Sequence, residues 1–357
     1  MAVSIVGGGI FGVTAALELR GRGHEVVLYD PDSPHPLAAS TDISKVVRAD
    51  YGADEALTEL GLEALDGWHR WNTEVFSRPL FHDEGFLLMT RAAMEPGGFE
   101  HSSWTLLRDR CGLRRLSTHP RWQNVADGYF NPRGGWAESG EVVRQLLAAC
   151  LDAGVVVRPQ VADPQTIIGP CVVAAGAWTH RLLPVLADRL RAVGQPVLHF
   201  QPSDPARWRA PKFPTWAHDI SKTGWYGFPA NAEGLVKIAH HGLGTEVDPA
   251  GERPLPEGTH ARFRAFLSEN LPDLAEAPIV FERLCLYSDS FDGDFFIDRV
   301  PDRRDLFVAA GGSGHGFKFA PVLGRLVADL VEGGAPHPRF AWRELGDRKT
   351  EEARSEV

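Results

Sequence analysis

The sequence is poor in the features that mark several classes of protein. It contains 4 cysteines in 357 residues, without a C-x-x-C pair or the spacing of a disulfide framework. No apolar run approaches the roughly 18 residues that a membrane span needs. Lys and Arg number 37 against 47 Asp and Glu, a formal net charge of -10, whereas nucleic-acid binding relies on basic residues. We therefore expect neither a membrane protein nor a nucleic-acid-binding protein.

Signals for a metal site and for export are also missing. Among 14 histidines only His240 and His241 are adjacent, and the patterns H-x-x-x-H and H-E-x-x-H do not occur. Met1 leads directly into a strand-like apolar run, with no signal-peptide pattern before it. Together with the few cysteines, this predicts a cytoplasmic protein without a bound metal, as a monomer or a small homo-oligomer.

The strongest pattern in the chain lies in its first 30 residues. A short apolar run of the kind found in buried parallel strands comes first. Gly7, Gly9 and Gly12 follow as G-x-G-x-x-G, then a helix over residues 13–20 and a second strand that ends at Asp30. Strand, glycines, helix, strand and acid in this order predict a dinucleotide site, with the pyrophosphate at the helix start and Asp30 on the ribose. A glycine-rich turn without a ligand is the alternative.

The remaining chain predicts a mixed α/β protein. A hydrophobic content of 43% in 357 residues is enough for two domains. Apolar periodicity predicts helices over residues 54–74, 140–153 and 257–271, and apolar runs predict strands over residues 86–89, 155–157, 171–175 and 306–310. Alternating aromatic and polar residues over 197–243 predict an antiparallel sheet.

We expect the two domains to be interleaved along the chain. The nucleotide-binding domain would comprise residues 1–85, 140–195 and 285–340, the substrate domain residues 86–139 and 196–284, and the C-terminal tail residues 341–357. One further helix is expected to begin near Ser40 and run toward Tyr51, and another to run from Gly314 to about residue 330. The charged residues of the tail are expected to fray.

Five sequence blocks follow one another in the order of a known family: Gly7–Gly12 with Asp30, Ser40–Arg48, Val172–Leu183, Tyr226–His241 and Cys285–Lys318, which contains GSGHGFK. On these blocks the chain resembles the flavin-dependent amine oxidases of the D-amino acid oxidase superfamily, above all monomeric sarcosine oxidase and the fructosyl-amino-acid oxidases. The resemblance implies an α/β fold with a Rossmann-like FAD-binding domain and an inserted antiparallel-sheet substrate domain. It also implies oxidation of a C–N bond with reduction of O2 to H2O2.

The resemblance implies how the cofactor is held. Cys285 matches the cysteine that bonds covalently to FAD, and Lys237 matches the lysine that activates O2. A buried structural cysteine and a lysine that reaches solvent are the alternatives. The other residues expected at the cofactor are Gly7, Gly9, Ile10, Phe11, Gly12, Asp30, Ser40, Thr41, Lys45, Val161, Gly176, Trp178, Gly312, Gly314, His315, Gly316, Phe317 and Lys318.

The resemblance also implies a substrate site. Arg48 and Lys318 match the two cations that bind the substrate carboxylate, for which Arg offers a bidentate fork. His241, Tyr226 and Tyr287 match residues of the substrate cavity, although ordinary core packing would explain the two tyrosines nearly as well. The expected partners are a small amine or amino-acid substrate and O2.

The segment Ser40–Arg48 leaves the substrate open. Thr41 and Lys45 stand where sarcosine oxidase has His and Arg, and the run TDISK is closer to the fructosyl-amino-acid oxidases. Arg48, in contrast, is similar to sarcosine oxidase. The predicted function is therefore that of an FAD-dependent oxidase of a secondary amine or an N-substituted amino acid.

Other functions remain alternatives at this point. A dehydrogenase of the same fold would pass electrons to an acceptor other than O2, and a biosynthetic enzyme would oxidise an amino acid or a cyclic imine. A dinucleotide-binding protein without redox chemistry would not need Cys285, Lys237 and Lys318 together. An NAD-dependent dehydrogenase would explain Gly7–Asp30 but would leave Gly312–Lys318 without a purpose.

Overall fold

Strand β1 (Ala2–Val6) lies inside a six-stranded sheet in the computed structural model, which describes residues 1–32, 34–350 and 353–355. The strand order is β17-β18-β10-β1-β2-β9, and every pair is parallel except β17 with β18. Apolar runs such as that of β18 are buried on both faces, as parallel strands require. The partner strands are β2 (Glu25–Tyr29), β9 (Val156–Arg158), β10 (Cys171–Val173), β17 (Phe296–Arg299) and β18 (Leu306–Ala310).

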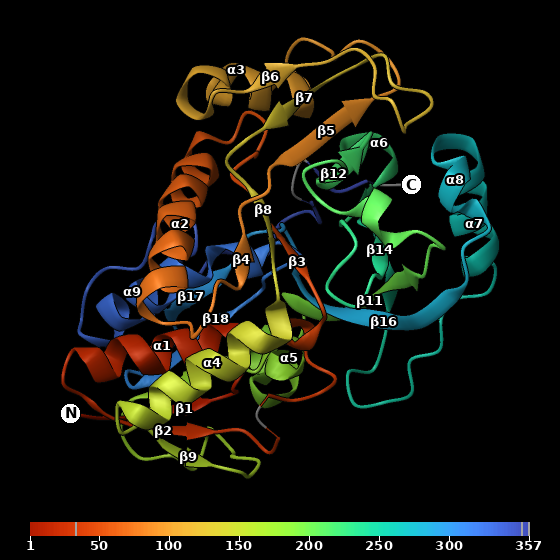
Figure 1. Cartoon of the computed structure of the whole chain (residues 1–357). Coiled ribbons are helices and arrows are strands. Elements are labelled where there is room, and N and C mark those ends of the chain that lie inside the picture. The colour runs from red at the N-terminus through yellow and green to blue at the C-terminus, as the bar shows by residue number, and fades with distance from the viewer. Residues whose placement is uncertain (33, 351–352, 356–357) are drawn as a thin grey trace.

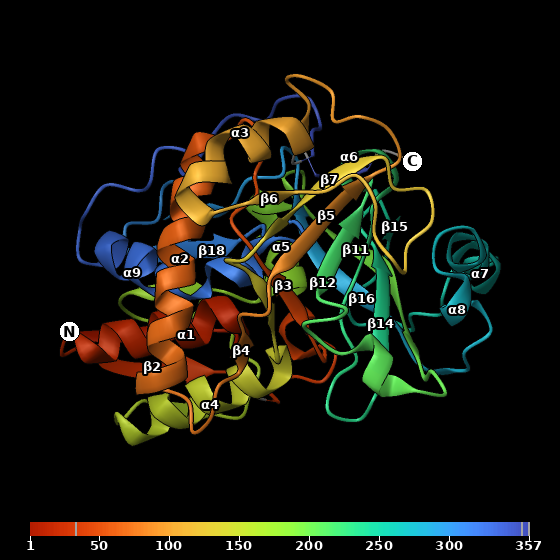
Figure 2. The same ribbon diagram turned by 45° about the horizontal axis from the view of Figure 1, so that its top comes forward.

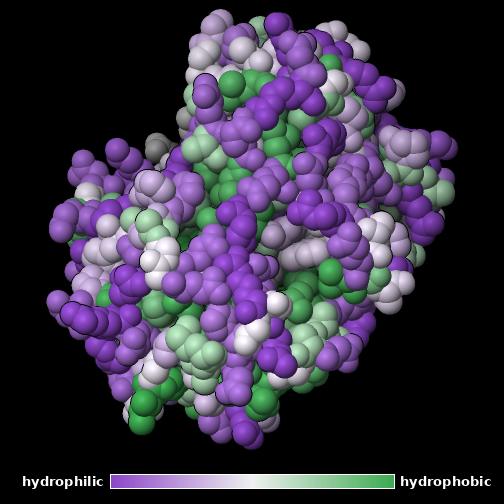
Figure 3. All heavy atoms as spheres, turned by 90° about the vertical axis from the view of Figure 1, so that its left-hand side faces the viewer, coloured by the Kyte–Doolittle hydropathy of each residue, from purple (hydrophilic) through white to green (hydrophobic). Residues whose placement is uncertain are grey.

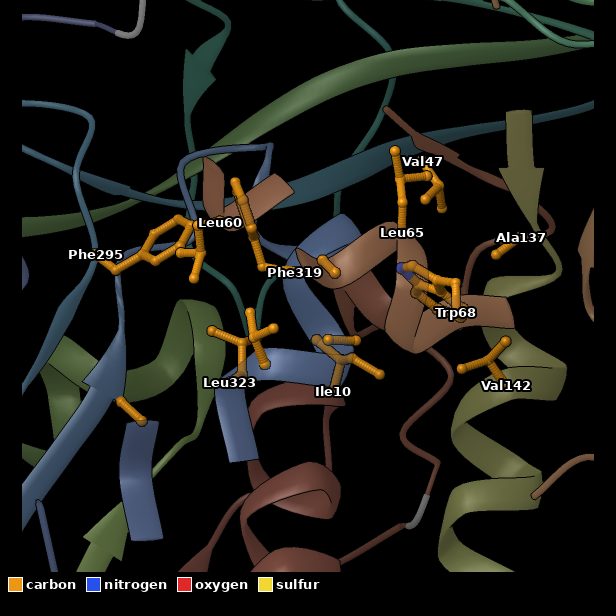
Figure 4. Packing of buried hydrophobic residues seen from close by; sticks show 14 of the residues in the cluster. Ile10, Val47, Leu60, Leu65, Trp68, Ala137, Val142, Phe295, Phe319 and Leu323 are labelled. Carbon is orange, nitrogen blue, oxygen red and sulfur yellow. The ribbon is translucent and has the colours of Figure 1, made fainter. Parts of the chain in front are cut away.

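Helix α1 (Ile10–Gly21) packs against α4 (Ser139–Asp152) and α9 (Ala320–Val331). Figure 1 shows α1 and α4 side by side over the six-stranded sheet. Helix α2 (Glu55–Glu74) begins where the Asp54 carboxylate accepts a hydrogen bond from the Leu57 amide, and it packs on α9. Side chains from these helices meet in one core, which includes Ile10, Trp68, Phe319 and Leu323 (Figure 4).

A nine-stranded sheet forms the other half of the molecule. All its strand pairs are antiparallel except β5 with β12, so the predicted antiparallel sheet is confirmed. Its strands are β5 (Phe86–Thr90), β6 (Arg114–Arg115), β7 (Asp127–Asn131), β11 (Leu190–Phe200), β12 (Thr215–His218), β13 (Trp225–Gly227), β14 (Val236–His240), β15 (Thr245–Glu246) and β16 (Ile279–Ser290). Helices α7 (Thr259–Asn270) and α8 (Pro272–Ala275) lie on its outer side (Figure 2).

Strands β11 and β16 pair with one another from Leu190 with Ser290 to Phe200 with Ile279. Both strands therefore belong to the nine-stranded sheet along their whole length. The domain boundaries expected after residue 195 and before residue 285 each fall inside one of these two strands. The sequence could not place these boundaries outside the strands, because apolar residues indicate that a strand forms but do not indicate which sheet it joins.

The helix expected from Ser40 toward Tyr51 is wrong. Only a 3-10 turn, η1 (Ala39–Thr41), forms there, and β3 (Lys45–Val47) follows it. Strand β3 pairs with β8 (Gly135–Ala137), which also pairs with β4 (Phe81–His82), in a three-stranded sheet. Two successive valines favour a strand when a partner strand is present, and the partner lies far away in the sequence.

The other predicted helices are confirmed as α2, α4 and α7, and the segment after Gly314 is divided in two. It forms the 3-10 turn η5 (Gly316–Phe319) before α9 begins. The remaining short elements are α3 (Phe99–Cys111), η2 (Gly176–Trp178), α5 (Thr179–Leu182), η3 (Pro184–Leu186), η4 (Pro205–Trp208) and α6 (Ile220–Thr223).

The expectation that the C-terminal tail frays is wrong at several of its described residues, although residues 344–349 are exposed and lie outside any helix or strand. The Arg343 guanidinium pairs with the Asp292 carboxylate at 2.5 Å. Farther along, Arg354 and Ser355 are buried, and Arg354 pairs with Asp289 at 2.7 Å. Charged residues at a chain end are expected to fray only when the folded protein offers them no residue of opposite charge. Here β16 supplies Asp289, and the loop after β16 supplies Asp292.

The surface in Figure 3 is mainly hydrophilic, with apolar residues visible chiefly between polar ones. Among the described residues, no helix is long and apolar enough to cross a membrane.

The packing of α9 on α1 predicts the effect of one glycine. A Cβ at Gly324 would lie 2.5 Å from the Thr14 carbonyl oxygen, whereas a Cβ at Gly21 would meet nothing within 4 Å. We expect Gly324→Ala to lower the free energy of unfolding by about 1–3 kcal/mol because the helices must separate. The control Gly21→Ala is expected to raise it by up to about 1 kcal/mol through helix propensity. Urea denaturation measures both, and equal effects would contradict this account of the helix contact.

Candidate active site

The turn after β1 requires its glycines. Gly7 has a φ of 110°, and a Cβ there would lie 2.5 Å from the Ala174 carbonyl oxygen. A Cβ at Gly12 would lie 1.8 Å from the Gly7 carbonyl oxygen, so α1 could not start so close to the strand. At Gly9 a Cβ would meet only the Ser40 hydroxyl, at 3.5 Å, which leaves the backbone there open to a ligand.

Asp30 lies at the end of β2 and holds this turn. Its carboxylate accepts hydrogen bonds from the Gly8 amide at 2.5 Å and from the Asp32 amide at 3.0 Å. Burial raises the pKa of Asp30, although these two hydrogen bonds oppose the shift. The Ser40 hydroxyl accepts from the Ile10 amide at 3.1 Å and fixes the start of the helix from the other side.

A cavity of about 390 Å³ runs along this edge of the six-stranded sheet. Gly7, Asp30, Ala174 and Gly311 line it, and they follow β1, β2, β10 and β18 directly. It therefore lies at the carboxyl ends of parallel strands, the usual ligand position in such sheets. The expected cofactor residues in its lining are Gly7, Gly9, Ile10, Phe11, Asp30, Ser40, Lys45, Val161, Gly176, Trp178, Gly312, Gly314, Gly316 and Phe317.

Five expected cofactor residues do not line this cavity, and two of them, His315 and Lys318, line a neighbouring one instead. Gly12 is packed under the turn, and the Thr41 hydroxyl donates to the carbonyls of His35 and Ala38, both at 2.8 Å. Cys285 is 1% exposed and lies behind the wall.

His35, which contacts the Trp178 ring, lines the cavity although no sequence pattern pointed to it. The position of Ala174 could have been inferred, because a residue that follows a buried parallel strand lies at this edge.

A second cavity of about 60 Å³ adjoins the first, and Lys45, Tyr287, Gly314 and Phe317 line both. It collects residues from the three-stranded sheet, from the nine-stranded sheet and from the segment before α9. The expected residues in its wall are Arg48, Tyr226, His241, Tyr287, His315 and Lys318. Phe86, Ala217, Ile220 and Phe228 complete the wall without having been expected, since their apolar character resembles that of any core residue.

Arg48 lines the second cavity with a buried guanidinium group. It is 7% exposed, and its guanidinium lies 5.4 Å from the Tyr51 ring and 5.6 Å from the Phe86 ring. Its Nη1 has no hydrogen-bond partner among the residues that the structure describes. A buried donor of this kind needs an acceptor, because its desolvation is otherwise uncompensated. Arg48 is therefore ready to bind an anion in the cavity.

Lys318 supplies a second cation. It is 6% exposed, and its ammonium group donates to the Tyr51 hydroxyl at 3.0 Å. That hydroxyl also lies 3.0 Å from His315 Nδ1, while the Lys318 carbonyl accepts from the Trp68 indole at 2.8 Å. Both the backbone and the side chain of Lys318 are thus fixed. Tyr51 was not among the expected site residues, although it follows Arg48 by only three positions.

Lys237 lies in a buried charge cluster behind both cavities. Its ammonium group donates to the Asp42 carboxylate at 2.5 Å and to the Ser44 carbonyl at 2.7 Å. Lys45 donates to the same Asp42 oxygen at 2.9 Å. The side chains of Asp42 and Lys237 are 0% and 3% exposed, so solvent screens this cluster very little.

The cluster shifts the ionisation of its members. Burial lowers the pKa of Lys237 to about 8, and the Asp42 carboxylate limits the shift. Burial also disfavours the charge of Lys45, but Asp42 raises the pKa of Lys45 above its ordinary value. Although burial alone would raise the pKa of Asp42, Lys237 and Lys45 hold it well below its usual range. Asp42 was not an expected site residue; the run TDISK, with an acid three positions before Lys45, was the available signal.

Cys285 differs from the other cysteines in its surroundings. Its sulfur accepts a hydrogen bond from Lys45 Nζ at 3.2 Å, and Lys45 lines the first cavity. A cation next to the sulfur is typical of reactive cysteines. Burial raises the pKa of the Cys150 and Cys171 thiols to about 12, as expected of structural cysteines.

Residues 2–330 of the chain match the family described as FAD dependent oxidoreductase (DAO). The chain belongs to this family. FAD is therefore the cofactor. The first cavity fits it, because the glycine turn at the start of α1 and the Asp30 carboxylate are the features that bind a dinucleotide. Gly7, Gly9, Asp30 and Ser40 are placed to hold its nucleotide half.

Relatives within the family cover nearly the whole chain. Monomeric sarcosine oxidase of Bacillus sp. (strain B-0618) is 27% identical over 368 residues, which cover 92% of this chain and 91% of that protein. L-saccharopine oxidase of Schizosaccharomyces pombe is 28% identical over 422 residues, covering 98% and 94%. The structure of fructosamine oxidase (amadoriase II) from Aspergillus fumigatus has a TM-score of 0.77 at 26% identity, covering 96% and 88%.

Proposed function

We propose that this FAD-dependent oxidoreductase is an oxidase of secondary amines that carry a carboxylate, such as N-substituted amino acids. The observation that carries the proposal is the guanidinium nitrogen of Arg48 that no described residue pairs with, in a cavity that adjoins the FAD cavity. Lys318 on the same wall adds a second charge for the carboxylate. The names of two relatives support the proposal, since sarcosine and L-saccharopine are both amino acids substituted on nitrogen.

In the proposed reaction the amine loses two electrons and two protons and becomes an imine, which water hydrolyses. O2 takes up the two electrons and two protons as H2O2. FAD, when bound, would accept the two electrons with the hydrogen that leaves the carbon next to nitrogen, and would pass the electrons to O2. Arg48 and Lys318 hold the carboxylate, and Tyr226, His241 and Tyr287 enclose the amine. Because no carboxylate lines this wall in the described chain, we expect the amine to enter in its neutral form.

Arg48 provides the direct test of substrate binding. We expect Arg48→Met to raise the KM for sarcosine or a larger N-methyl amino acid about 30-fold, because a charged hydrogen bond contributes about 2 kcal/mol. Arg48→Lys should recover part of the loss, since it keeps the charge but not the fork. The exposed Arg70 supplies the control Arg70→Met. An unchanged KM in Arg48→Met would contradict the proposal; oxygen uptake measures each variant.

We further propose that Lys237 speeds the reduction of O2, because a fixed ammonium group stabilises the negative charge of superoxide. Lys237→Met is expected to slow reoxidation of the reduced protein by O2 about 100-fold. In the unmutated protein the rate should fall as the pH rises through about 8, where Lys237 loses its proton. The exposed Lys212 gives the control Lys212→Met. Stopped-flow absorbance follows reoxidation, and an equal rate in Lys237→Met would refute the role.

Covalent attachment of FAD through Cys285 is part of the same proposal. The thioether forms when the thiol and the flavin 8-methyl group each lose one hydrogen, and O2 accepts the two electrons. The 3.2 Å contact of Lys45 Nζ with the sulfur supports Cys285 as the attachment point. The four cysteines, all free, also support the proposed cytoplasmic location.

Acid precipitation tests the covalent bond. We expect the yellow colour to stay with the precipitated unmutated protein and to move to the supernatant for Cys285→Ala. The buried Cys150 supplies the control Cys150→Ala, which should keep its colour in the pellet. Colour in the supernatant of the unmutated protein would exclude the covalent bond while leaving FAD as the cofactor. Visible absorbance of both fractions is the measurement.

A further inference from the structure

The described end of the chain is anchored by a buried arginine. Arg354 is 4% exposed, and its Nε donates to the Gly242 carbonyl at 2.8 Å and its Nη2 to the Leu243 carbonyl at 3.2 Å. The same Nη2 pairs with the Asp289 carboxylate at 2.7 Å, where both side chains are 2% exposed. The guanidinium thus donates hydrogen bonds to two carbonyls that follow β14 and forms an ion pair with a carboxylate of β16, away from solvent.

Ser355 ties a third element to this point. Its amide donates to the His241 carbonyl at 3.0 Å, and its hydroxyl donates to the Lys222 carbonyl at 2.9 Å. Lys222 lies in α6, and His241 follows β14 directly. We call Arg354 and Ser355 the C-terminal clamp.

Each element that the clamp holds also carries a wall residue of the second cavity. Ile220 comes from α6, His241 is itself bound by the clamp, and Tyr287 precedes Asp289 by two residues on β16. The Arg354 guanidinium lies 5.5 Å from the centre of the Tyr287 ring, and His241 Nδ1 lies 3.3 Å from the Tyr287 hydroxyl. The clamp therefore contacts Tyr287 and His241, two residues that line the second cavity, without lining the cavity itself.

Charge gives the clamp an effect beyond packing. Asp289 is a buried carboxylate behind Tyr287, and Arg354 is its close counter-charge, since the nearest other cation, Arg191 Nη2, is 4.0 Å away. Without Arg354, the negative charge of Asp289 would be poorly compensated in a region of low dielectric constant. That charge would disfavour a second carboxylate in the adjoining cavity.

We propose that the C-terminal clamp positions His241 and Tyr287 and thereby sets the affinity of the second cavity for carboxylate ligands. Arg354 is a positioning residue, because it acts through Tyr287, His241 and Asp289 and does not line the cavity. The proposal rests on the proposed function only in taking the second cavity as the substrate site. It gives the charged tail a role in substrate binding.

The test compares two arginines of the tail in the FAD-loaded protein. Arg354→Ala removes the clamp cation, and Arg348→Ala removes an exposed one. Acetate is the probe, and its Kd is read from the change that it causes in flavin absorbance, so turnover is not required. We expect Arg354→Ala to raise the acetate Kd and the KM for sarcosine about tenfold, which corresponds to about 1.4 kcal/mol. The flavin content and kcat should stay within a factor of about two, because Arg354 itself lines neither cavity.

Two further variants separate positioning from folding. Arg354→Lys keeps the charge opposite Asp289 and should recover most of the acetate affinity. Ser355→Ala removes the hydroxyl bond to the Lys222 carbonyl and should raise the Kd about threefold, which remains measurable if Arg354→Ala does not fold. Kd values equal to that of Arg348→Ala in both Arg354→Ala and Ser355→Ala would overturn the proposal, as would a loss of kcat at unchanged Kd.

The same data distinguish this proposal from the proposed function. If the unmutated protein binds acetate but oxidises no secondary amine, the proposed function fails and the clamp is still tested by the acetate Kd. If the unmutated protein oxidises sarcosine and the clamp variants bind acetate as tightly, only the clamp fails.

Discussion

The carboxylate of Asp42 is the point at which the parts of the molecule meet. It accepts hydrogen bonds from Lys45 on β3 of the small sheet and from Lys237 on β14 of the large sheet. Its backbone carbonyl accepts from the Ser139 hydroxyl at 2.6 Å and from the Gly140 amide at 3.0 Å, at the start of α4. A single buried acid thus compensates two buried ammonium groups, either of which would be costly alone. The walls of both cavities depend on this arrangement, because Lys45 lines both of them.

Local charge decides what the two cavities can bind. The chain as a whole is acidic, with a formal net charge of -10. Yet the second cavity presents Arg48 and Lys318, and behind it two lysines share one carboxylate. Interactions inside a buried site are screened far less than those at the surface, so nearby cations outweigh distant surface acids. An anionic amino acid can therefore bind to an acidic protein, and the same surroundings favour negative charge on reduced oxygen.

The sequence predicted well where neighbouring residues are sufficient. Gly7, Gly12 and Asp30 lie within one β-α-β unit, so their spacing alone fixes the turn, the helix start and the acid at the strand end. Helix α2 likewise follows from its own periodicity and its Asp54 cap. The family blocks brought Arg48, Lys318, His241 and Tyr287 together correctly around one cavity. They did so through resemblance, since these residues come from segments that no local rule connects.

By itself, then, the sequence determined the dinucleotide turn and most of the helices and strands, because short-range periodicity and glycine geometry are encoded locally. Only the tertiary structure decided the rest. Lys45–Val47 became a strand because β8 supplies its partner. Asp42 became a bridge because two lysines from different sheets converge on it. Arg354 became buried because Asp289 and the turn after β14 offer it acceptors far away in the sequence. Each of these depends on a partner that only folding brings near.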